Sequence, residues 1–200
     1  MVRETREVAL RPHAALVIID VQVDFCEGGA LEVKGGNTVA ANIDRFVRNA
    51  GNQVYGKVVA TRDWHDEGSN NGHISDKPDF VNNWPVHCVH DTPGAAYHPR
   101  IQKLVDEGFV TREFFKGQGD HGYSGWSAVD ANGGTLAKYL TDAGVGIVDV
   151  VGLAADYCVR ATAEDAVKAG FDVSVWPSMT TGIDPKAVSK LIRDLVIAKK

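Results

Sequence analysis

The feature that most constrains the fold is the alternation of short apolar runs with amphipathic segments. Five runs rich in branched residues are short enough to be strands buried on both faces: Leu16–Ile19, Val58–Thr61, Phe109–Phe115, Ile147–Leu153 and Val173–Trp176. Four segments carry apolar residues at helical spacing: Thr38–Ala50, Thr135–Ala143, Tyr157–Ala169 and Pro185–Ala198. This alternation predicts an α/β fold, a three-layer αβα sandwich around a mostly parallel central sheet.

Length and charge narrow the class further. The chain has 200 residues without an evident linker or repeat, which predicts a single domain over residues 1–200. Its hydrophobic fraction of 44% and charged fraction of 24% are ordinary for a globular protein. The formal net charge is −5 and no Lys/Arg stripe offsets it locally, so we expect no nucleic-acid partner.

Cysteine usage and hydropathy give an expectation for the compartment. The three cysteines, Cys26, Cys88 and Cys158, are an odd number without CxxC spacing, which favours free thiols in a reducing compartment. The longest apolar stretches, Ala14–Ile19 and Val150–Ala155, are far shorter than the ~20 residues of a membrane helix. The N-terminal residues do not resemble a signal peptide. We therefore expect a cytoplasmic protein without a membrane partner. The number of subunits stays open, and a homo-oligomer is one of the alternatives.

Parallel sheets bind ligands beyond the carboxyl ends of their strands, and two charged residues stand at predicted strand ends. Asp20 closes the first run, where partial burial would raise its proton affinity toward that of a general base, although such an Asp can also simply cap the next turn. Lys116 ends the third run. It can extend to solvent, but the following glycine-rich loop, with Tyr123 and Trp126 as flat walls, favours a ligand site.

Cys158 is the third candidate, in the segment VVGLAADYCVRATAEDAV. A helix that starts after Asp156, as its N-cap, places the thiol in the first helical turn. The helix dipole and the unpaired backbone amides there would stabilise a thiolate and could hold an oxyanion. The alternative is a small apolar residue packed under the sheet.

A second constellation contains Asp63, His65, His73 and His87. Asp63 and His65 alternate across Trp64 just after a predicted strand, so in extended conformation both side chains point the same way. Two or three histidines with one carboxylate suit Zn²⁺, Fe²⁺ or Mn²⁺, although DxH also occurs by chance. His73 and His87 belong to the long Gly-, Asn- and Pro-rich segment Asp66–His98, which is either a functional loop or an insertion.

Several strings together resemble one known family. They are IIDVQVDFCEGGAL, VVATRDWH, GHIS, WPVHCV with DTPGAAYHP, FFKG with GYSGW, and VVGLAADYCVRATAEDAV, in the family's order over most of the chain. The sequence is similar to the nicotinamidase/pyrazinamidase branch of the isochorismatase-like cysteine hydrolases. This resemblance implies the isochorismatase-like hydrolase fold and an amidase that converts nicotinamide to nicotinate and ammonia and also accepts pyrazinamide.

The resemblance assigns a role to each strand-end residue. Asp20, Lys116 and Cys158 occupy the positions of the family's triad, in which the cysteine attacks the carboxamide and forms a thioester. Asp20 would take the thiol proton, and Lys116 would hold the carboxylate. The backbone amides of Ala154 and Cys158 would bind the oxyanion, and the family has a cis peptide bond at the position of Leu153–Ala154.

The family also has one divalent metal ion and an aromatic pocket. The metal maps onto Asp63, His65 and His87, and His73 is a ligand in some members. The substrate pocket maps onto Phe25, Leu31, Trp84 and Tyr123, of which the aromatic side chains can sandwich a pyridine ring.

Three other functions compete with this interpretation. The chain could be a relative with the same fold that acts on another small amide or on isochorismate, although the DxH and WPVHC strings argue against an enzyme that needs no metal. It could be a binding protein without turnover, although every reacting residue is present. It could also be a metallohydrolase in which a metal-bound hydroxide attacks and Cys158 is structural.

Overall fold

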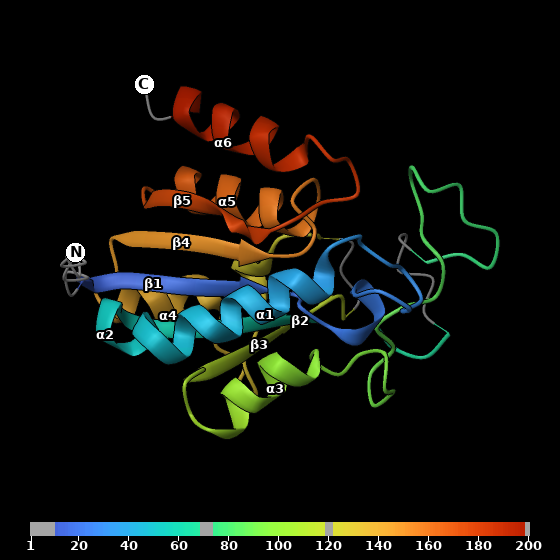
Figure 1. Ribbon diagram of the computed structural model, residues 1–200, viewed down its shortest axis with the longest axis horizontal. Helices are drawn as coiled ribbons and strands as arrows, with labels where there is room; N and C mark the ends of the chain where they lie inside the picture. The colour runs from blue at the N-terminus through green and yellow to red at the C-terminus, as the bar shows by residue number, and fades with distance from the viewer. Residues whose placement is uncertain (1–10, 69–73, 119–121, 199–200) are drawn as a thin grey trace, which may run out of the picture.

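A single five-stranded sheet forms the centre of the computed structural model, which describes residues 11–68, 74–118 and 122–198 (Figure 1). The strands are β1 (Arg11–Ile19), β2 (Tyr55–Asp63), β3 (Arg112–Lys116), β4 (Ile147–Gly152) and β5 (Asp172–Thr180). Their order is β3-β2-β1-β4-β5, and each neighbouring pair is parallel. The predicted parallel sheet is confirmed, and the carboxyl ends of all five strands lie at the same edge.

Helices cover both faces of the sheet and make the predicted three layers (Figure 1). One face carries α1 (Gly36–Phe46), a π-helical turn (Val47–Gly51), α2 (Asn52–Val54) and α3 (Pro99–Asp106). The other carries α4 (Leu136–Asp142), α5 (Cys158–Lys168) and α6 (Ala187–Ala198), and short 3-10 turns occur at Val23–Phe25 and Gly125–Ser127. Among the described residues, no helix combines the length and the hydropathy that crossing a membrane requires.

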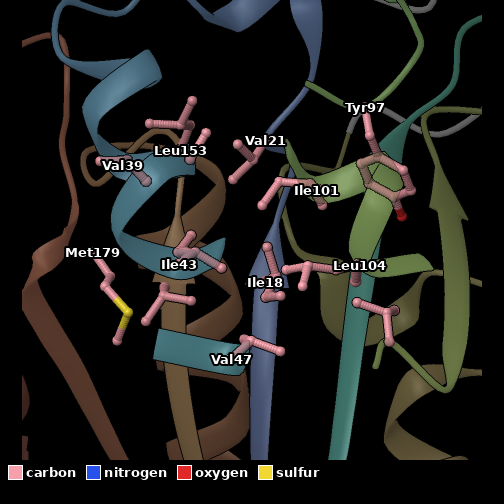
Figure 2. Packing of buried hydrophobic residues seen from close by; sticks show 14 of the residues in the cluster. Ile18, Val21, Val39, Ile43, Val47, Tyr97, Ile101, Leu104, Leu153 and Met179 are labelled. Atoms are coloured by element: carbon pink, nitrogen blue, oxygen red, sulfur yellow. The ribbon is translucent and has the colours of Figure 1, made fainter. Parts of the chain in front are cut away.

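Each face of the sheet has its own apolar core, because alternate residues of β1 point to opposite faces. Ile18 lies in the core of the first face with Ile43 of α1 and Leu104 of α3 (Figure 2). Val17 lies in the core of the second face with Leu140 of α4. All five side chains have no exposed surface. This two-sided burial explains why the first run lacks the polar alternation of a half-exposed strand.

The third predicted strand, Phe109–Phe115, begins too early, because β3 starts at Arg112. The backbone N–H groups of Phe109 and Val110 donate to Leu104 O, at 2.9 and 3.1 Å, so these two residues close the end of α3. The apolar spacing of the sequence does not predict α3. Its start signal is local: Pro99 occupies the first turn, and the His98 ring accepts from the N–H of Arg100.

Truncation of the first core tests how much it contributes to stability. Ile43 is fully buried, so we expect Ile43→Ala to lower the free energy of unfolding by about 2–5 kcal/mol, measured by chemical denaturation. The matched control is Ile197→Ala on α6, where the side chain is 64% exposed and the change is expected within about 0.5 kcal/mol. Equal losses in the two variants would contradict the assignment of Ile43 to the core.

Candidate active site

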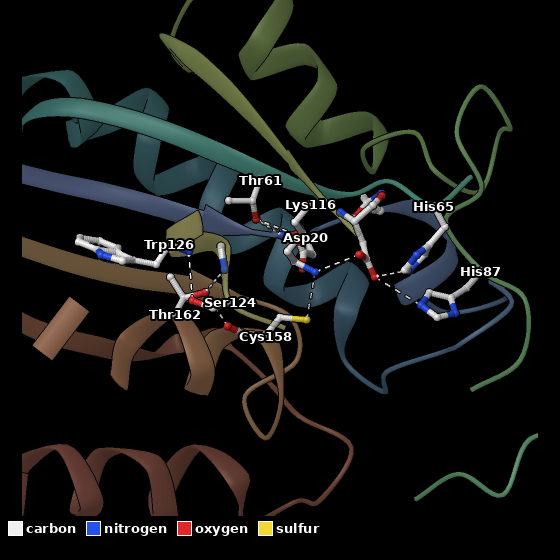
Figure 3. Close-up of polar contacts among 12 residues, drawn as sticks. Asp20, Thr61, His65, His87, Lys116, Ser124, Trp126, Cys158 and Thr162 are labelled. Carbon is white, nitrogen blue, oxygen red and sulfur yellow. Dashed lines mark hydrogen bonds and ion pairs between the residues drawn. The ribbon is translucent and has the colours of Figure 1, made fainter. Parts of the chain in front are cut away.

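Three strand ends bring Asp20, Lys116 and Cys158 into contact at the carboxyl edge of the sheet. Asp20 directly follows β1, Lys116 ends β3, and Cys158 is the first residue of α5, which follows β4. The Lys116 Nζ atom lies 3.0 Å from Asp20 Oδ2 and 3.5 Å from Cys158 Sγ. Figure 3 shows the ammonium group between the carboxylate and the thiol. The residues of the predicted triad are therefore neighbours in space, while their chemical roles stay predictions.

Burial governs the protonation of these groups. Asp20 has no exposed surface, and Lys116 and Cys158 are each 7% exposed. Burial raises the pKa of the Asp20 carboxyl, although the Lys116 ammonium opposes this shift. Burial would lower the pKa of Lys116, but Asp20 and Asp63 outweigh it and raise that pKa well above its usual range.

The electrostatics of the Cys158 thiol differ from the expectation of a stabilised thiolate. Burial raises the pKa of the thiol well above its usual range, and the opposing effect of Lys116 is smaller. A base beside the sulfur can take its proton. Among the described residues, two carboxylates contact the ammonium group that lies beside the thiol, those of Asp20 and Asp63.

Thr61, which the sequence analysis had not singled out, orients the Asp20 carboxylate. The Thr61 hydroxyl donates to Asp20 Oδ1 at 2.6 Å and accepts from the Asp20 N–H at 3.3 Å. Asp20 itself has a φ of 47°, so the chain turns sharply as it leaves β1. With Oδ1 bound to Thr61, the Oδ2 atom faces Lys116.

Asp63 connects the triad to the predicted metal ligands. Its Oδ1 atom lies 3.1 Å from Lys116 Nζ, while its Oδ2 atom lies 3.1 Å from His65 Nε2 and 3.4 Å from His87 Nε2. Burial alone would raise the pKa of Asp63, but Lys116 and the hydrogen bonds from the two histidines hold it well below its usual range. The carboxylate is therefore ionised and is shared between two clusters.

The donor set of Asp63, His65 and His87 fits a divalent cation. All three residues are buried, and their ligand atoms lie within 4.8 Å of one another. His87 Nδ1 lies 2.7 Å from Pro85 O, which can only accept, so Nδ1 carries a proton and Nε2, which faces Asp63 Oδ2, is the ring nitrogen that could ligate a cation. The residues present therefore fit a cation ligated by both side chains. His73, predicted as a further ligand, lies outside the described residues.

Gly117 lets the chain pass close to these ligands. It has a φ of 86°, and a Cβ atom there would lie 2.9 Å from both Asp63 Oδ1 and His65 Cε1. A side chain at this position would displace the carboxylate or the imidazole. The glycine directly after Lys116 is thus required by the crowding around Asp63.

A mainly apolar pocket opens beside the Cys158 thiol. The residues predicted to bind substrate, Phe25, Leu31, Trp84 and Tyr123, all line it. Trp84 Nε1 donates to the Tyr123 hydroxyl at 3.1 Å, which fixes two of the flat walls relative to each other. The other lining residues are Val33, Asp63, His87, Ala154, Tyr157, Cys158 and Ile183.

Tyr157 is a pocket wall that the sequence analysis missed. Its ring lies 5.0 Å from that of Trp84, almost perpendicular at 84°, and 5.3 Å from that of Tyr123. Its position directly before Cys158 could have indicated this role, because a residue next to a nucleophile in a strand–helix loop lies at the same edge of the sheet as the pocket. Three aromatic rings therefore enclose one side of the pocket.

The loop between β4 and α5 carries the predicted oxyanion amides. Ala154 and Cys158 both line the pocket, and the Leu153–Ala154 peptide bond is cis, as the family resemblance implied. The predicted N-cap role of Asp156 is wrong. Tyr157 is the N-cap, and the Asp156 carboxylate instead accepts from the N–H groups of Ile183 and Asp184, at 3.1 and 2.7 Å. Among the described residues, no side chain caps the α5 N-terminus, and the Cys158 N–H lacks an intrahelical acceptor.

Comparison with known proteins shows similarity over most of the chain. The chain is 46% identical over 170 residues to the nicotinamidase/pyrazinamidase of Mycobacterium tuberculosis. This alignment covers 84% of this chain and 87% of that protein. The pyrazinamidase of Pyrococcus horikoshii in complex with zinc has a TM-score of 0.73 and 34% identity, over 94% of this chain and 96% of its own. The yeast nicotinamidase bound to the inhibitor nicotinaldehyde has a TM-score of 0.78 and 26% identity, over 93% of this chain and 97% of its own. The model of the isochorismatase domain matches residues 14–198, so the chain belongs to the isochorismatase family.

Proposed function

We propose that this chain is an amidohydrolase that converts nicotinamide to nicotinate and ammonia and also deamidates pyrazinamide. The observation that carries the proposal is the contact of Lys116 Nζ with both Asp20 and Cys158, beside a pocket with flat aromatic walls. The relatives are named nicotinamidase or nicotinamidase/pyrazinamidase, which supports this substrate class. A flat pyridine or pyrazine amide matches the shape and the apolar character of such a pocket.

Attack begins with a proton transfer from sulfur to carboxylate. Asp20 takes the proton of the Cys158 thiol, and the sulfur forms a bond to the carboxamide carbon. Lys116 stabilises the thiolate, because its ammonium group lies 3.5 Å from Cys158 Sγ while it also contacts the carboxyl group that has taken the proton. The negative charge that develops on the carbonyl oxygen would be held by the N–H groups of Ala154 and Cys158.

The intermediate then releases ammonia and is hydrolysed. Asp20 returns its proton to the amide nitrogen, the C–N bond breaks, and ammonia leaves a thioester on Cys158. Water gives a proton to Asp20 and attacks the thioester carbon, after which the C–S bond breaks and the sulfur recovers its proton. One amide and one water thus yield one acid and one ammonia.

We further propose that Asp63, His65 and His87 hold one divalent cation, Zn²⁺, Fe²⁺ or Mn²⁺, with His73 as a fourth protein ligand. Such an ion supplies a Lewis acid that can ligate the ring nitrogen of the substrate or water at the pocket wall. Within the chain itself, Asp63 and His87 line the pocket, so they orient the ring while Lys116 holds Asp63 in place.

Removal of the thiol separates attack by sulfur from attack by a metal-bound hydroxide. We expect Cys158→Ala to abolish ammonia release from nicotinamide while the content of bound metal is unchanged. Cys26→Ala is the matched control, since Cys26 is buried but does not line the pocket. Substantial residual activity in Cys158→Ala would favour the hydroxide mechanism.

The two charged members of the triad are tested without changing their size. Asp20→Asn removes the base and Lys116→Met removes the ammonium group, and each is expected to lower kcat about 100-fold or more. Circular dichroism should show a folded chain in both cases, with a lower melting temperature in Lys116→Met, which leaves two buried carboxylates without their shared cation. Near-normal turnover in either variant would refute the role assigned to that residue.

Metal removal tests the second cluster and the substrate assignment together. Metal analysis should find about one ion per chain, and chelation should lower nicotinamide hydrolysis until zinc, iron or manganese is added back. Pyrazinamide should be hydrolysed in the same assay and isochorismate should not. Full activity of a metal-free preparation would exclude the cluster from the reaction, and turnover of neither amide would overturn the proposed function.

A further inference from the structure

Gln22 has a fully buried side chain that none of the steps above uses. Its Nε2 group donates to Asp63 O at 2.8 Å and to Ala95 O at 2.9 Å. Its Oε1 atom accepts from the Asp63 N–H at 2.8 Å. The carboxamide therefore binds both backbone polar groups of Asp63 and anchors them to the segment that contains Ala95.

This contact lies where β1 stops pairing with β2. The last backbone pair between these strands joins Ile18 and Ala60, and the positive φ of Asp20 then turns the chain away. On its other side, β2 continues to pair with β3 as far as Asp63 opposite Lys116. The side chain of Gln22 supplies the donor and the acceptor that the next residues of β1 would have supplied, because a carboxamide has the same polar groups as a peptide unit.

The position of Asp63 affects two contacts at once. One carboxylate oxygen lies 3.1 Å from Lys116 Nζ, and the other lies 3.1 and 3.4 Å from the Nε2 atoms of His65 and His87. A strand end that lacks a partner on one side opens more easily than the strand interior. A shift of this backbone would move both oxygen atoms away from their partners.

We propose that Gln22 is a positioning residue that fixes the backbone of Asp63, so that one carboxylate serves both the metal-ligand cluster and Lys116. The inference rests on the proposed function, because that function makes Asp63 a metal ligand. The Gln22 side chain does not line the pocket, and its hydrogen bonds go to backbone groups of Asp63 and Ala95, while the Gln22 backbone N–H donates to Asp20 O at 2.8 Å. A substitution of the side chain therefore acts on the reaction through Asp63 and the backbone around it.

The chemistry of this position requires glutamine. Methionine has a similar length but no polar group that replaces the carboxamide, so Gln22→Met would leave buried backbone groups of Asp63 and Ala95 without their partner. Glutamate has nearly the same shape, but its carboxylate has no proton to donate to the two carbonyl oxygens that Gln22 binds. Both variants thus disrupt the hydrogen bonds between residue 22 and the backbone of Asp63 and Ala95, by different means.

Zinc affinity of the full-length chain tests the proposal directly. We expect Gln22→Met and Gln22→Glu to bind Zn²⁺ at least tenfold more weakly than the unchanged chain, in competition with a chromogenic chelator. The control is Gln53→Met, an exposed glutamine on α2, with an expected change of less than twofold. Circular dichroism and thermal melting report whether each variant is folded.

Zinc affinity within twofold of the unchanged chain in either folded variant would overturn the assignment. If Gln22→Met does not fold, the zinc affinity of Gln22→Glu decides the question. If neither variant folds, Gln22 is a residue of general structural importance, and the assignment is overturned as well. Nicotinamide hydrolysis by the unchanged chain is measured separately. Suppose that the variants bind zinc more weakly but the unchanged chain releases no ammonia from nicotinamide. This result would retain the role of Gln22 and reject the proposed function.

Discussion

The site depends on one buried ammonium group held between two buried carboxylates. Lys116 lies within 3.1 Å of both Asp20 and Asp63, in a region where water contributes little screening. Loss of this cation would leave two uncompensated buried charges, which is among the most costly changes in a protein interior. The second oxygen of Asp63 faces two histidines that suit a divalent ion. The lysine therefore joins the reacting groups and the metal-ligand cluster into a single charge network.

The parallel sheet explains why distant residues meet here. Strands in the order β3-β2-β1-β4-β5 end at one edge, so Lys116, Asp63 and Asp20 arrive from three adjacent strands. The loop after β4 then turns into α5 and presents Cys158 to the same edge. The segments that follow β2 and β3, which contain Trp84 and Tyr123, supply walls of the pocket. The rigid sheet fixes the reacting atoms, while the loops determine which substrate reaches them.

The sequence predicted the strand-end residues because a charged residue that ends an apolar run has few places to lie in a parallel sheet. It predicted the pocket positions through motifs that resemble a known family. It could not predict α3, a short helix whose last turn is closed by residues that resemble a strand. Nor could it show that Asp156 binds the segment before α6 or that Gln22 replaces a strand neighbour, because both depend on contacts between residues far apart in the chain.

The central claim is that the Cys158 sulfur forms a covalent bond to the carbonyl carbon. Nicotinaldehyde with a ¹³C-labelled carbonyl group tests this most directly, since addition of the thiol across its C=O bond gives a thiohemiacetal with a tetrahedral carbon. We expect the NMR signal of the bound label to move to the tetrahedral range in the unchanged chain and to keep the aldehyde position in Cys158→Ala. A bound aldehyde that stays trigonal in the unchanged chain, or a tetrahedral signal that persists in Cys158→Ala, would contradict attack by sulfur.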